Sequence, residues 1–370
     1  MIEGLATASA TERFRQRFSS LHPSHFRLFQ DLWASSIGLG TYLGDSDDRT
    51  DALYAEAIRT ALSSGCNVLD TAINYRCQRS ERTIGRLIGS LVSEGIITRE
   101  ELILCTKGGY LPFDGEVPKD PARYFVETMI NAGLAQYEDV VAGCHCVAPS
   151  YLDASLSTSL ANLRVRTVDL YYLHNPEQQL DEVDRDIFLQ RLAPAFELLE
   201  QRVQDGFIRY YGVATWNGLR CNPKARGYLS LETLVELAKR SGGSSHHFRV
   251  IQLPLNLAMS EACSFQNQSV EGESMTVLQA AERLGLSVVT SASLLQSQLA
   301  RLPAKLEMRI PGLSTSAQRA IQFVRSTPGV ATALVGMKRR EHVEENLRLA
   351  QQPVMTADEV GRLFDRTRTS

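Results

Sequence analysis

The sequence has little of what marks a secreted, membrane-spanning or nucleic-acid-binding protein. Its 39 lysines and arginines are outnumbered by 42 aspartates and glutamates, which gives the 370 residues a net charge of −3. There is therefore no basic excess with which to bind nucleic acid or an anionic membrane surface. No apolar run reaches the roughly 18 residues that a membrane-spanning helix needs. We expect neither a nucleic acid nor a membrane as a partner.

A secretory signal and a disulfide framework are also lacking. The first segment, MIEGLATASATERFRQRF, has no apolar region of the kind that signal peptides contain. Its three arginines and scarce acidic residues leave a transit peptide as the alternative. The seven cysteines are odd in number and scattered along a long chain, unlike those of a disulfide-rich protein. We expect reduced thiols and a cytoplasmic location.

Two of the cysteines flank a histidine in Cys144-His145-Cys146. This tripeptide suggests a metal, but structural zinc sites usually combine a C-x2-4-C motif with a second pair of ligands. We expect no metal here. The segment VVAGCHCV, Val140–Val147, is instead interpreted as a strand whose thiols are buried as small hydrophobic groups.

Short apolar segments alternate with longer amphipathic segments along most of the chain. The apolar segments are mostly continuous, as in parallel strands that are covered on both faces. The predicted strands are Ser36–Gly40, Asn67–Asp70, Leu102–Thr106, Val168–Leu173, Tyr210–Ala214, Val250–Leu255, Ser287–Ser291 and Ala331–Val335. The predicted helices are Ala52–Ser63, Ser80–Leu91, Leu152–Leu163, Leu189–Asp205, Leu231–Arg240, Met275–Leu284, Ser316–Arg325 and His342–Ala350.

Eight strands in alternation with helices predict an α/β fold, a closed (β/α)8 barrel of the TIM type. A doubly wound sheet is the alternative, but its usual G-x-G-x-x-G fingerprint is broken here by Leu43 in place of the third glycine. We expect an N-terminal arm over residues 1–25 and a single barrel domain over residues 26–370. Two additions to the barrel are an N-terminal hairpin, Phe26–Gln30 against Leu32–Ile37, and an insertion after the third strand, about 108–148, with a helix over Arg123–Leu134.

Four polar residues lie at or just past the ends of successive predicted strands. Asp70 ends the second strand, Lys107 follows the third, His174 follows the fourth, and Tyr75 comes five residues after Asp70. In a barrel, side chains at the carboxyl ends of different strands converge on one mouth. Each residue alone has an ordinary explanation, such as an ion pair or a packed histidine. Their joint placement favours a catalytic site.

Together these four side chains suit the reduction of a carbonyl group. A buried ammonium beside a phenol favours the phenolate and lowers the phenol's pKa, which eases proton donation to a carbonyl oxygen. A carboxylate keeps the ammonium charged, and a histidine orients the oxygen and stabilises its developing charge. We therefore predict Tyr75 as the general acid, Lys107 as the group that tunes it, Asp70 as the partner of Lys107, and His174 as the orienting group. None of them supplies a hydride, so a nicotinamide cofactor is expected.

From about residue 26 to residue 349 the chain resembles the aldo-keto reductase family. The segments that carry the resemblance are IGLGTYLG, NVLDTAINY, LCTKGG, SLANLRVRTVDLYYLHNPE, YYGVATW, VIQLPLN and TPGVATALVGMKRREHVEENL. The resemblance implies the barrel, NADPH as the hydride donor, and an aldehyde or ketone as the substrate. It also implies that Asp70, Tyr75, Lys107 and His174 form the family's catalytic tetrad.

The resemblance assigns further residues to the nicotinamide end of the cofactor. In the family a Ser-Asn pair and a glutamine hold the carboxamide. Gln252 is present, but the pair is Ala214-Thr215 here, so Thr215 or Asn217 is expected to substitute. The tyrosine that stacks on nicotinamide in many members corresponds to Ser291, so its ring is missing or supplied from elsewhere. Further contacts implied for the cofactor are Gly40, Thr41, Tyr42 and Asp70.

The adenosine end is expected after the last strand. Gly336-Met337-Lys338-Arg339 leads into a helix, and helix N-termini favour anions. Lys338 and Arg339 add charge that suits a 2′-phosphate, which favours NADPH over NADH. An ordinary basic loop is the alternative. The resemblance places Glu345 and Asn346 against adenine.

His145 and Trp216 are candidates for substrate contacts, with a merely packed side chain as the alternative for each. Two other functions stay open. The first is a barrel isomerase or aldolase with Lys107 as a Schiff-base nucleophile, which leaves the basic segment after the last strand unexplained. The second is an NADPH-binding barrel that acts mainly as a redox-sensing or scaffold subunit with little turnover.

Overall fold

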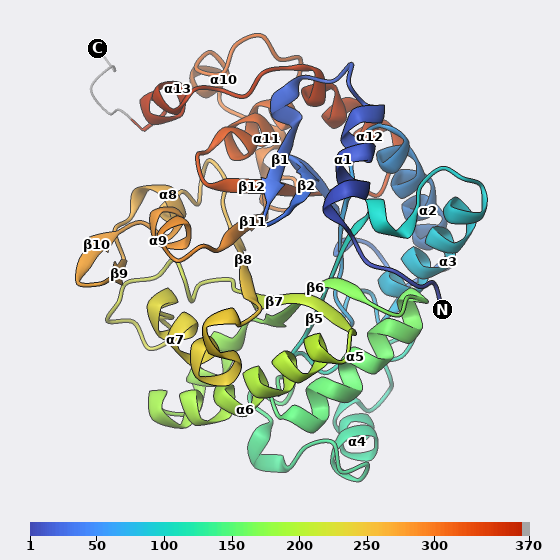
Figure 1. Cartoon of the computed structure of the whole chain (residues 1–370), viewed down its shortest axis with the longest axis vertical. Coiled ribbons are helices and arrows are strands. Elements are labelled where there is room, and N and C mark those ends of the chain that lie inside the picture. Colours follow the sequence, from blue (N-terminus) through green and yellow to red (C-terminus); the bar gives the residue numbers. More distant parts are fainter. Residues whose placement is uncertain (365–370) are drawn as a thin grey trace.

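The eight predicted strands form a closed, all-parallel barrel. The computed structural model describes residues 1–364 and orders the strands β11-β12-β3-β4-β5-β6-β7-β8 around the barrel (Figure 1). This arrangement confirms the (β/α)8 fold, and the closed order rules out a doubly wound open sheet. The bounds are β3 (Ile37–Gly40), β4 (Val68–Asp70), β5 (Ile103–Gly108), β6 (Val168–His174), β7 (Ile208–Ala214), β8 (Phe248–Pro254), β11 (Ser287–Ser291) and β12 (Val330–Gly336).

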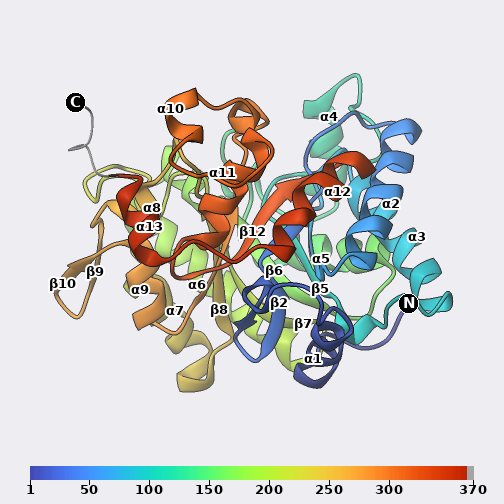
Figure 2. The same ribbon diagram turned by 90° about the horizontal axis from the view of Figure 1, so that it is seen from above.

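Helices follow the barrel strands and surround them (Figures 1 and 2). Several begin at a polar side chain that caps free backbone N–H groups; Asp47, for example, accepts a hydrogen bond of 2.7 Å from the backbone of Thr50. The surrounding helices are α2 (Asp48–Ser63), α3 (Arg79–Ser93), α5 (Pro149–Leu163), α6 (Arg185–Gln204), α7 (Leu231–Gly242), α9 (Val277–Arg283), α11 (Ser316–Ser326) and α12 (Arg340–Leu347). Shorter additions are α8 (Glu261–Ser264), β9 (Gln268–Val270), β10 (Glu273–Met275), α10 (Ala304–Glu307) and α13 (Ala357–Arg362).

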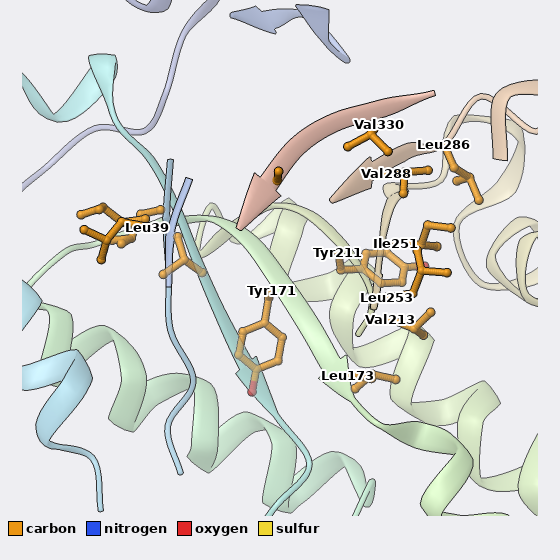
Figure 3. Packing of buried hydrophobic residues seen from close by; sticks show 14 of the residues in the cluster. Leu39, Tyr171, Leu173, Tyr211, Val213, Ile251, Leu253, Leu286, Val288 and Val330 are labelled. Carbon is orange, nitrogen blue, oxygen red and sulfur yellow. The ribbon is translucent and has the colours of Figure 1, made fainter. Parts of the chain in front are cut away.

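Side chains on the strands alternate between the barrel interior and the layer beneath the helices. On β6, Leu170 and Tyr172 belong to the interior cluster. Tyr171 and Leu173 belong to the larger cluster between strands and helices, part of which is shown in Figure 3. His174 therefore has the inward parity of Tyr172, which directs it toward the mouth of the barrel.

The predicted N-terminal hairpin is present and closes the opposite end of the barrel. β1 (Phe26–Phe29) pairs antiparallel with β2 (Leu32–Ser35). Phe29, Leu32 and Ala34 from this hairpin join the interior cluster, so they fill the end of the barrel where the strands begin. The preceding helix α1 (Ala8–Arg17) packs on β2 and buries Phe14 completely.

The insertion after β5 differs from its prediction. The expected helix over Arg123–Leu134 is shorter: α4 (Pro121–Phe125) continues as a π-helical segment, Val126–Ile130. The expected strand Val140–Val147 is wrong. Left-handed backbone at Ala142 and Gly143 turns the chain back, so that Val141 and His145 exchange backbone hydrogen bonds of 2.8 and 3.0 Å. The segment is a tight turn because a run that reverses direction cannot continue as a strand.

Three further observations bear on the expectations from composition. All seven cysteines are free. Within residues 1–364, no helix combines the length and apolar character that crossing a membrane would require. The same residues contain no cluster of three or more His, Cys, Asp or Glu side chains that could hold a metal ion.

Candidate active site

A cavity of about 430 Å³ opens where the barrel strands end. Its wall includes the last residues of β4, β6, β11 and β12, together with loops that follow β3 and β7. Asp70, Tyr75 and His174 line this cavity, and Lys107 lies behind Asp70, so the four predicted catalytic residues are brought together. Their convergence follows from the barrel, which turns the carboxyl ends of all strands to one face.

Lys107 and Asp70 form a buried ion pair beneath the cavity. The lysine Nζ lies 2.5 Å from Oδ1 of Asp70 and also donates to the backbone oxygen of Thr71 at 2.8 Å. Oδ2 of Asp70 accepts a hydrogen bond of 2.8 Å from Gln252. Burial lowers the pKa of Lys107, but Asp70 and Tyr75 outweigh burial, and the net pKa is raised. The side chain is therefore an ammonium at neutral pH.

Tyr75 is held between the ammonium and the histidine. Nζ of Lys107 lies 4.9 Å from the centre of its ring, and the ring meets His174 edge-on at a centroid distance of 5.8 Å. Burial raises the pKa of Tyr75, and although Lys107 lowers it, the net pKa lies above the ordinary value. The expectation that the pKa of Tyr75 is lowered is therefore wrong, because it considered the effect of the ammonium but not the larger effect of burial. The phenol carries its proton at neutral pH, as an acid must.

His174 is neutral and presents one edge to the cavity. Burial lowers its pKa well below the ordinary value, and Lys107 and His145 lower it further. Nδ1 is enclosed and has no hydrogen-bond partner in the part of the chain that is described. A ligand in the cavity would therefore meet the Nε2 edge of the ring.

The loop that carries Tyr75 has an unusual backbone that was not predicted from the sequence. Arg76, Cys77 and Gln78 follow it with φ of 51°, 53° and 69°, a left-handed run without a glycine. The buried guanidinium of Arg76 donates to the backbone oxygen of Asp45 at 2.8 Å and to Oδ1 of Asp51 at 2.5 Å. These contacts tie the Tyr75 loop to the β3–α2 loop and to α2. Strained backbone of this kind persists only where surrounding contacts enforce it.

The residues expected at the nicotinamide end fall into two groups. Gly40, Thr41, Tyr42, Thr215, Gln252 and Ser291 all line the cavity. The hydroxyl of Thr215 is enclosed and unpartnered within residues 1–364. Asn217 lies outside the cavity lining, and its side-chain oxygen accepts from Arg220 at 3.3 Å. Of the two expected substitutes for the Ser-Asn pair, the geometry favours Thr215.

The residues expected at the adenosine end lie beyond β12, at and within α12. Gly336 lines the cavity; Met337 is buried, Lys338 is half-buried, and Arg339 is exposed at the start of α12. Glu345 accepts a hydrogen bond of 2.7 Å from Thr315. Asn346 is buried, with an Oδ1 that has no partner among the described residues. The segment thus combines two basic side chains, a helix start and an unused acceptor.

The two candidate substrate residues are placed differently. Trp216 lines the cavity with 41% of its surface exposed. His145 is completely buried, lies outside the lining, and uses both ring nitrogens in hydrogen bonds with His174 and Gln179. The expectation that His145 contacts substrate is therefore wrong. It depended on the strand over Val140–Val147, which does not exist.

Other cavity residues were missed in the sequence, although they sit beside predicted ones. Asn74 precedes Tyr75 and Asn175 follows His174, and both line the cavity with Tyr110. Asn175 donates to the Tyr110 hydroxyl at 3.1 Å. The two asparagines could have been predicted, because each is next to a residue that was already assigned to the site. Tyr110 lies three residues past Lys107, in the insertion after the third predicted strand, and long loops at that end of a barrel usually shape its mouth.

Comparisons with known proteins agree with this geometry. A sequence model of the Aldo/keto reductase family matches residues 36–226. The uncharacterized oxidoreductase YqkF of Bacillus subtilis is 24% identical over 343 residues, which are 91% of this chain and 94% of that protein. The 6-dehydroglucose reductase of Novosphingobium aromaticivorans is 27% identical over 184 residues, 49% of this chain and 48% of that protein. A solved structure of an aldo/keto reductase from Klebsiella pneumoniae, in complex with NADP and acetate, shares the fold with a TM-score of 0.60 at 21% identity, covering 92% of this chain and 94% of that one.

Proposed function

Because this chain belongs to the aldo/keto reductase family, we propose that it is an NADPH-dependent oxidoreductase that reduces an aldehyde or a ketone to an alcohol, with Tyr75 as the general acid. One observation carries the proposal. The ring of Tyr75 stands in the cavity wall between a lysine ammonium, 4.9 Å from its centre, and the ring of His174. This is an arrangement that can hand a proton to an oxygen and stabilise the charge on that oxygen.

Each of the four residues then has one task. Tyr75 donates its proton to the carbonyl oxygen. The ammonium of Lys107 favours the phenolate that forms, and Asp70 keeps that ammonium charged in spite of its burial. His174 directs its Nε2 edge at the carbonyl oxygen and fixes its orientation, because Nδ1 is enclosed. When bound, NADPH would supply the hydride.

The residues of the cavity fit such a cofactor. At the nicotinamide end, the unused hydroxyl of Thr215 is available for a carboxamide, beside Gln252. At Gly40 the nearest atom to an added Cβ would be 3.9 Å away, so this wall leaves room for a ligand. At the other end, Lys338, Arg339 and the start of α12 would hold the 2′-phosphate. Oδ1 of Asn346, which has no hydrogen-bond partner among residues 1–364, would accept from an adenine amino group.

The reaction is expected in a reducing compartment such as the cytoplasm. All seven cysteines are free thiols. Burial raises the pKa of Cys66 and Cys263 to about 11, and that of Cys146 to about 12. Such thiols stay protonated and unreactive at neutral pH, so they serve as packing groups.

The decisive experiment compares the wild type with Tyr75→Phe. NADPH oxidation is followed at saturating cofactor with a panel of aldehydes and ketones, and NADPH binding is measured separately by fluorescence titration. We expect the variant to bind NADPH and to lose about 10²- to 10⁴-fold in turnover, the usual contribution of a general acid. Unchanged turnover in Tyr75→Phe would remove this residue from its role.

Two further outcomes separate the proposal from its alternatives. A wild type that binds NADPH but reduces no carbonyl would match the redox-sensing or scaffold subunit. Borohydride trapping of a covalent adduct between Lys107 and a carbonyl compound would favour the Schiff-base chemistry of an aldolase. Against the latter, Nζ of Lys107 lies behind Asp70 and donates to both Asp70 and the backbone of Thr71, which leaves it little freedom to attack.

A further inference from the structure

We propose that His145, which lies in the insertion after β5, is a positioning residue that fixes the backbone of His174 through a hydrogen bond to its carbonyl oxygen. The inference rests on the proposed function, because it assumes that the orientation of His174 matters for turnover. It concerns a buried residue outside the cavity, and the family resemblance assigned no role to it.

The hydrogen bond replaces one that the barrel does not provide. β5 ends at Gly108, which pairs with Leu173, so the backbone ladder on this side stops one residue short of His174. Nε2 of His145 lies 2.8 Å from the His174 oxygen and takes the place of the missing backbone donor. On the other side, the N–H of Asn175 donates to Ala214 at 2.6 Å. The peptide between His174 and Asn175 is thus held at both its oxygen and its nitrogen.

This peptide needs such support because the chain turns sharply after it. Asn175 has a left-handed backbone with φ of 46°. A non-glycine residue in this region carries a conformational cost that neighbouring contacts must offset. Rotation of the peptide would swing the Cα–Cβ bond of His174 and with it the ring that faces the cavity.

The His174 carbonyl oxygen can only accept, so Nε2 of His145 must donate to it, and a chain of polar contacts behind His145 favours the same tautomer. Arg191 donates to Gln179 at 2.7 Å, and a guanidinium can only donate, so the atom of Gln179 that it meets must be the oxygen. The amide nitrogen of Gln179 therefore points at Nδ1 of His145, 2.9 Å away, and also at the backbone oxygen of His145, 3.2 Å away. Nδ1 is then an acceptor, and the proton of the neutral ring resides on Nε2.

Burial keeps this ring neutral. The pKa of His145 is lowered to about 4, mainly because the ring is removed from water, and the bond to the His174 carbonyl raises it only in part. The tautomer with its proton on Nε2 is thus maintained throughout the neutral pH range, which keeps a donor directed at His174.

The residues around this hydrogen bond leave space for it and pack against it. Gly109 has φ of 141°, and a Cβ there would lie 2.9 Å from the His174 oxygen and 3.0 Å from Nε2 of His145. Only glycine leaves the path between the two groups open. The ring of Tyr110 meets both histidines edge-on, each at a centroid distance of 5.0 Å, and so packs against the pair from one side.

Three variants of His145 test the role. Glutamine carries its Nε2 the same number of bonds from Cβ as histidine does, so His145→Gln retains a donor in place. His145→Asn and His145→Leu do not. We expect the latter two to lower kcat by about 10- to 100-fold, since a small misplacement of a catalytic group has effects of this size. His145→Gln is expected to restore most of kcat, while the Kd for NADPH stays within about twofold in all three.

His25→Asn is the matched control. His25 is also completely buried and also contacts a backbone carbonyl, that of Gly65, at 3.0 Å, but at the opposite end of the barrel. The substitution His25→Asn is expected to lower the stability of the protein and to leave kcat unchanged. A loss of kcat in His25→Asn equal to that in His145→Leu would mean that burial alone explains both effects, and would overturn the proposal.

A second readout does not require turnover. Nitrogen NMR of the selectively labelled protein reports which ring nitrogen of His145 carries the proton, and we expect Nε2 in the wild type. A proton on Nδ1 in the wild type would refute the hydrogen bond. If the wild type reduces no carbonyl, the proposed function fails while this measurement still decides the bond. If the wild type is active and His145→Leu keeps its kcat, the positioning role alone fails.

Discussion

Nζ of Lys107 lies 2.5 Å from Oδ1 of Asp70, and the other carboxylate oxygen of Asp70 accepts a hydrogen bond from Gln252. A buried ammonium is stable only with such a counter-charge, because burial by itself favours the neutral amine. Asp70 therefore determines the charge of Lys107, and through it the ease with which Tyr75 loses its proton.

Asp70→Asn is expected to make activity depend on pH in a new way. Without the carboxylate, burial lowers the pKa of Lys107, and the ammonium forms only as the pH falls through that lowered pKa. At pH 8, kcat/KM should fall by about 10²-fold or more, with partial recovery toward acid pH. The measurement is the pH profile of kcat/KM for both proteins. Glu127→Gln, which alters the exposed pair with Arg123, is the control. Parallel profiles for the wild type and Asp70→Asn would contradict the argument.

Arg76→Met tests whether the left-handed loop after Tyr75 positions its ring. The substitution keeps a non-glycine residue at φ of 51° but removes the bonds to Asp45 and Asp51. Asp51 keeps its pair with Arg79, so loss of the Arg76 hydrogen bonds should reduce the free energy of unfolding by about 2 kcal/mol. We also expect kcat to fall by about tenfold while the Kd for NADPH is unchanged.

Arg79→Met is the comparison for that variant. Arg79 contacts the same carboxylate, Asp51, at 2.8 Å, but it lies in α3 rather than in the Tyr75 loop. It should reduce stability with little effect on kcat. Equal loss of kcat in both variants would show that the ion-pair cluster acts through stability alone.

The sequence predicted the barrel because continuous apolar runs such as Val168–Leu173 read as buried strands wherever they occur. It predicted the convergence of Asp70, Lys107 and His174 for the same reason, since strand ends meet at one face. The positions of the strands and of the residues at their ends depend on local sequence, so they can be predicted from local patterns. The eight strands accordingly appear close to their predicted bounds.

The predictions that were wrong concern features that depend on tertiary packing, which cannot be inferred from a local sequence pattern. Val140–Val147 is apolar enough for a strand, yet Ala142 and Gly143 turn it back on itself. The role of His145 follows from that turn, and so could not be predicted without it. The net pKa of Tyr75 depends on how deeply the ring is enclosed, and the contacts of Arg76 depend on a loop more than twenty residues earlier in the chain.

Lys338→Met combined with Arg339→Ala tests the choice of cofactor. Both cations lie between the end of β12 and the start of α12, where a 2′-phosphate would meet them. The double variant is expected to weaken NADPH binding by about 10- to 100-fold, as expected for losing charge-assisted bonds to phosphate, and to change NADH binding little. Fluorescence titration with each nucleotide measures this.

The neighbouring Arg340 supplies the control for the cofactor test. It is also at the start of α12, but its guanidinium is engaged by Glu344 at 2.6 Å. Arg340→Met should therefore leave the preference for NADPH intact. If the double variant prefers NADPH over NADH as strongly as the wild type does, the 2′-phosphate binds elsewhere.

The buried histidine at the closed end of the barrel is expected to make stability depend on pH. Burial lowers the pKa of His25 to about 4, and Arg325 and Arg27 lower it further against the opposing bond to Gly65. In the unfolded chain a histidine titrates near 6.5. Between these values the unfolded state binds a proton that the folded state does not. The free energy of unfolding therefore rises with pH across this window and falls on acidification, by up to about 3 kcal/mol.

His25→Asn removes this titration and gives the argument its test. At pH 8 the variant loses the packing and the hydrogen bonds of the neutral ring, so it should be less stable than the wild type. At pH 5 the wild type has lost part of its stability, because the unfolded chain binds a proton that His25 in the folded state does not. The difference in stability between the wild type and His25→Asn should therefore be smaller at pH 5 than at pH 8. Urea denaturation at both pH values measures the effect. Asn67→Ala, at a buried and non-titrating amide that donates to Trp33 at 2.8 Å, should be equally destabilised at both. An equal difference for His25→Asn at both pH values would mean that His25 does not carry the dependence.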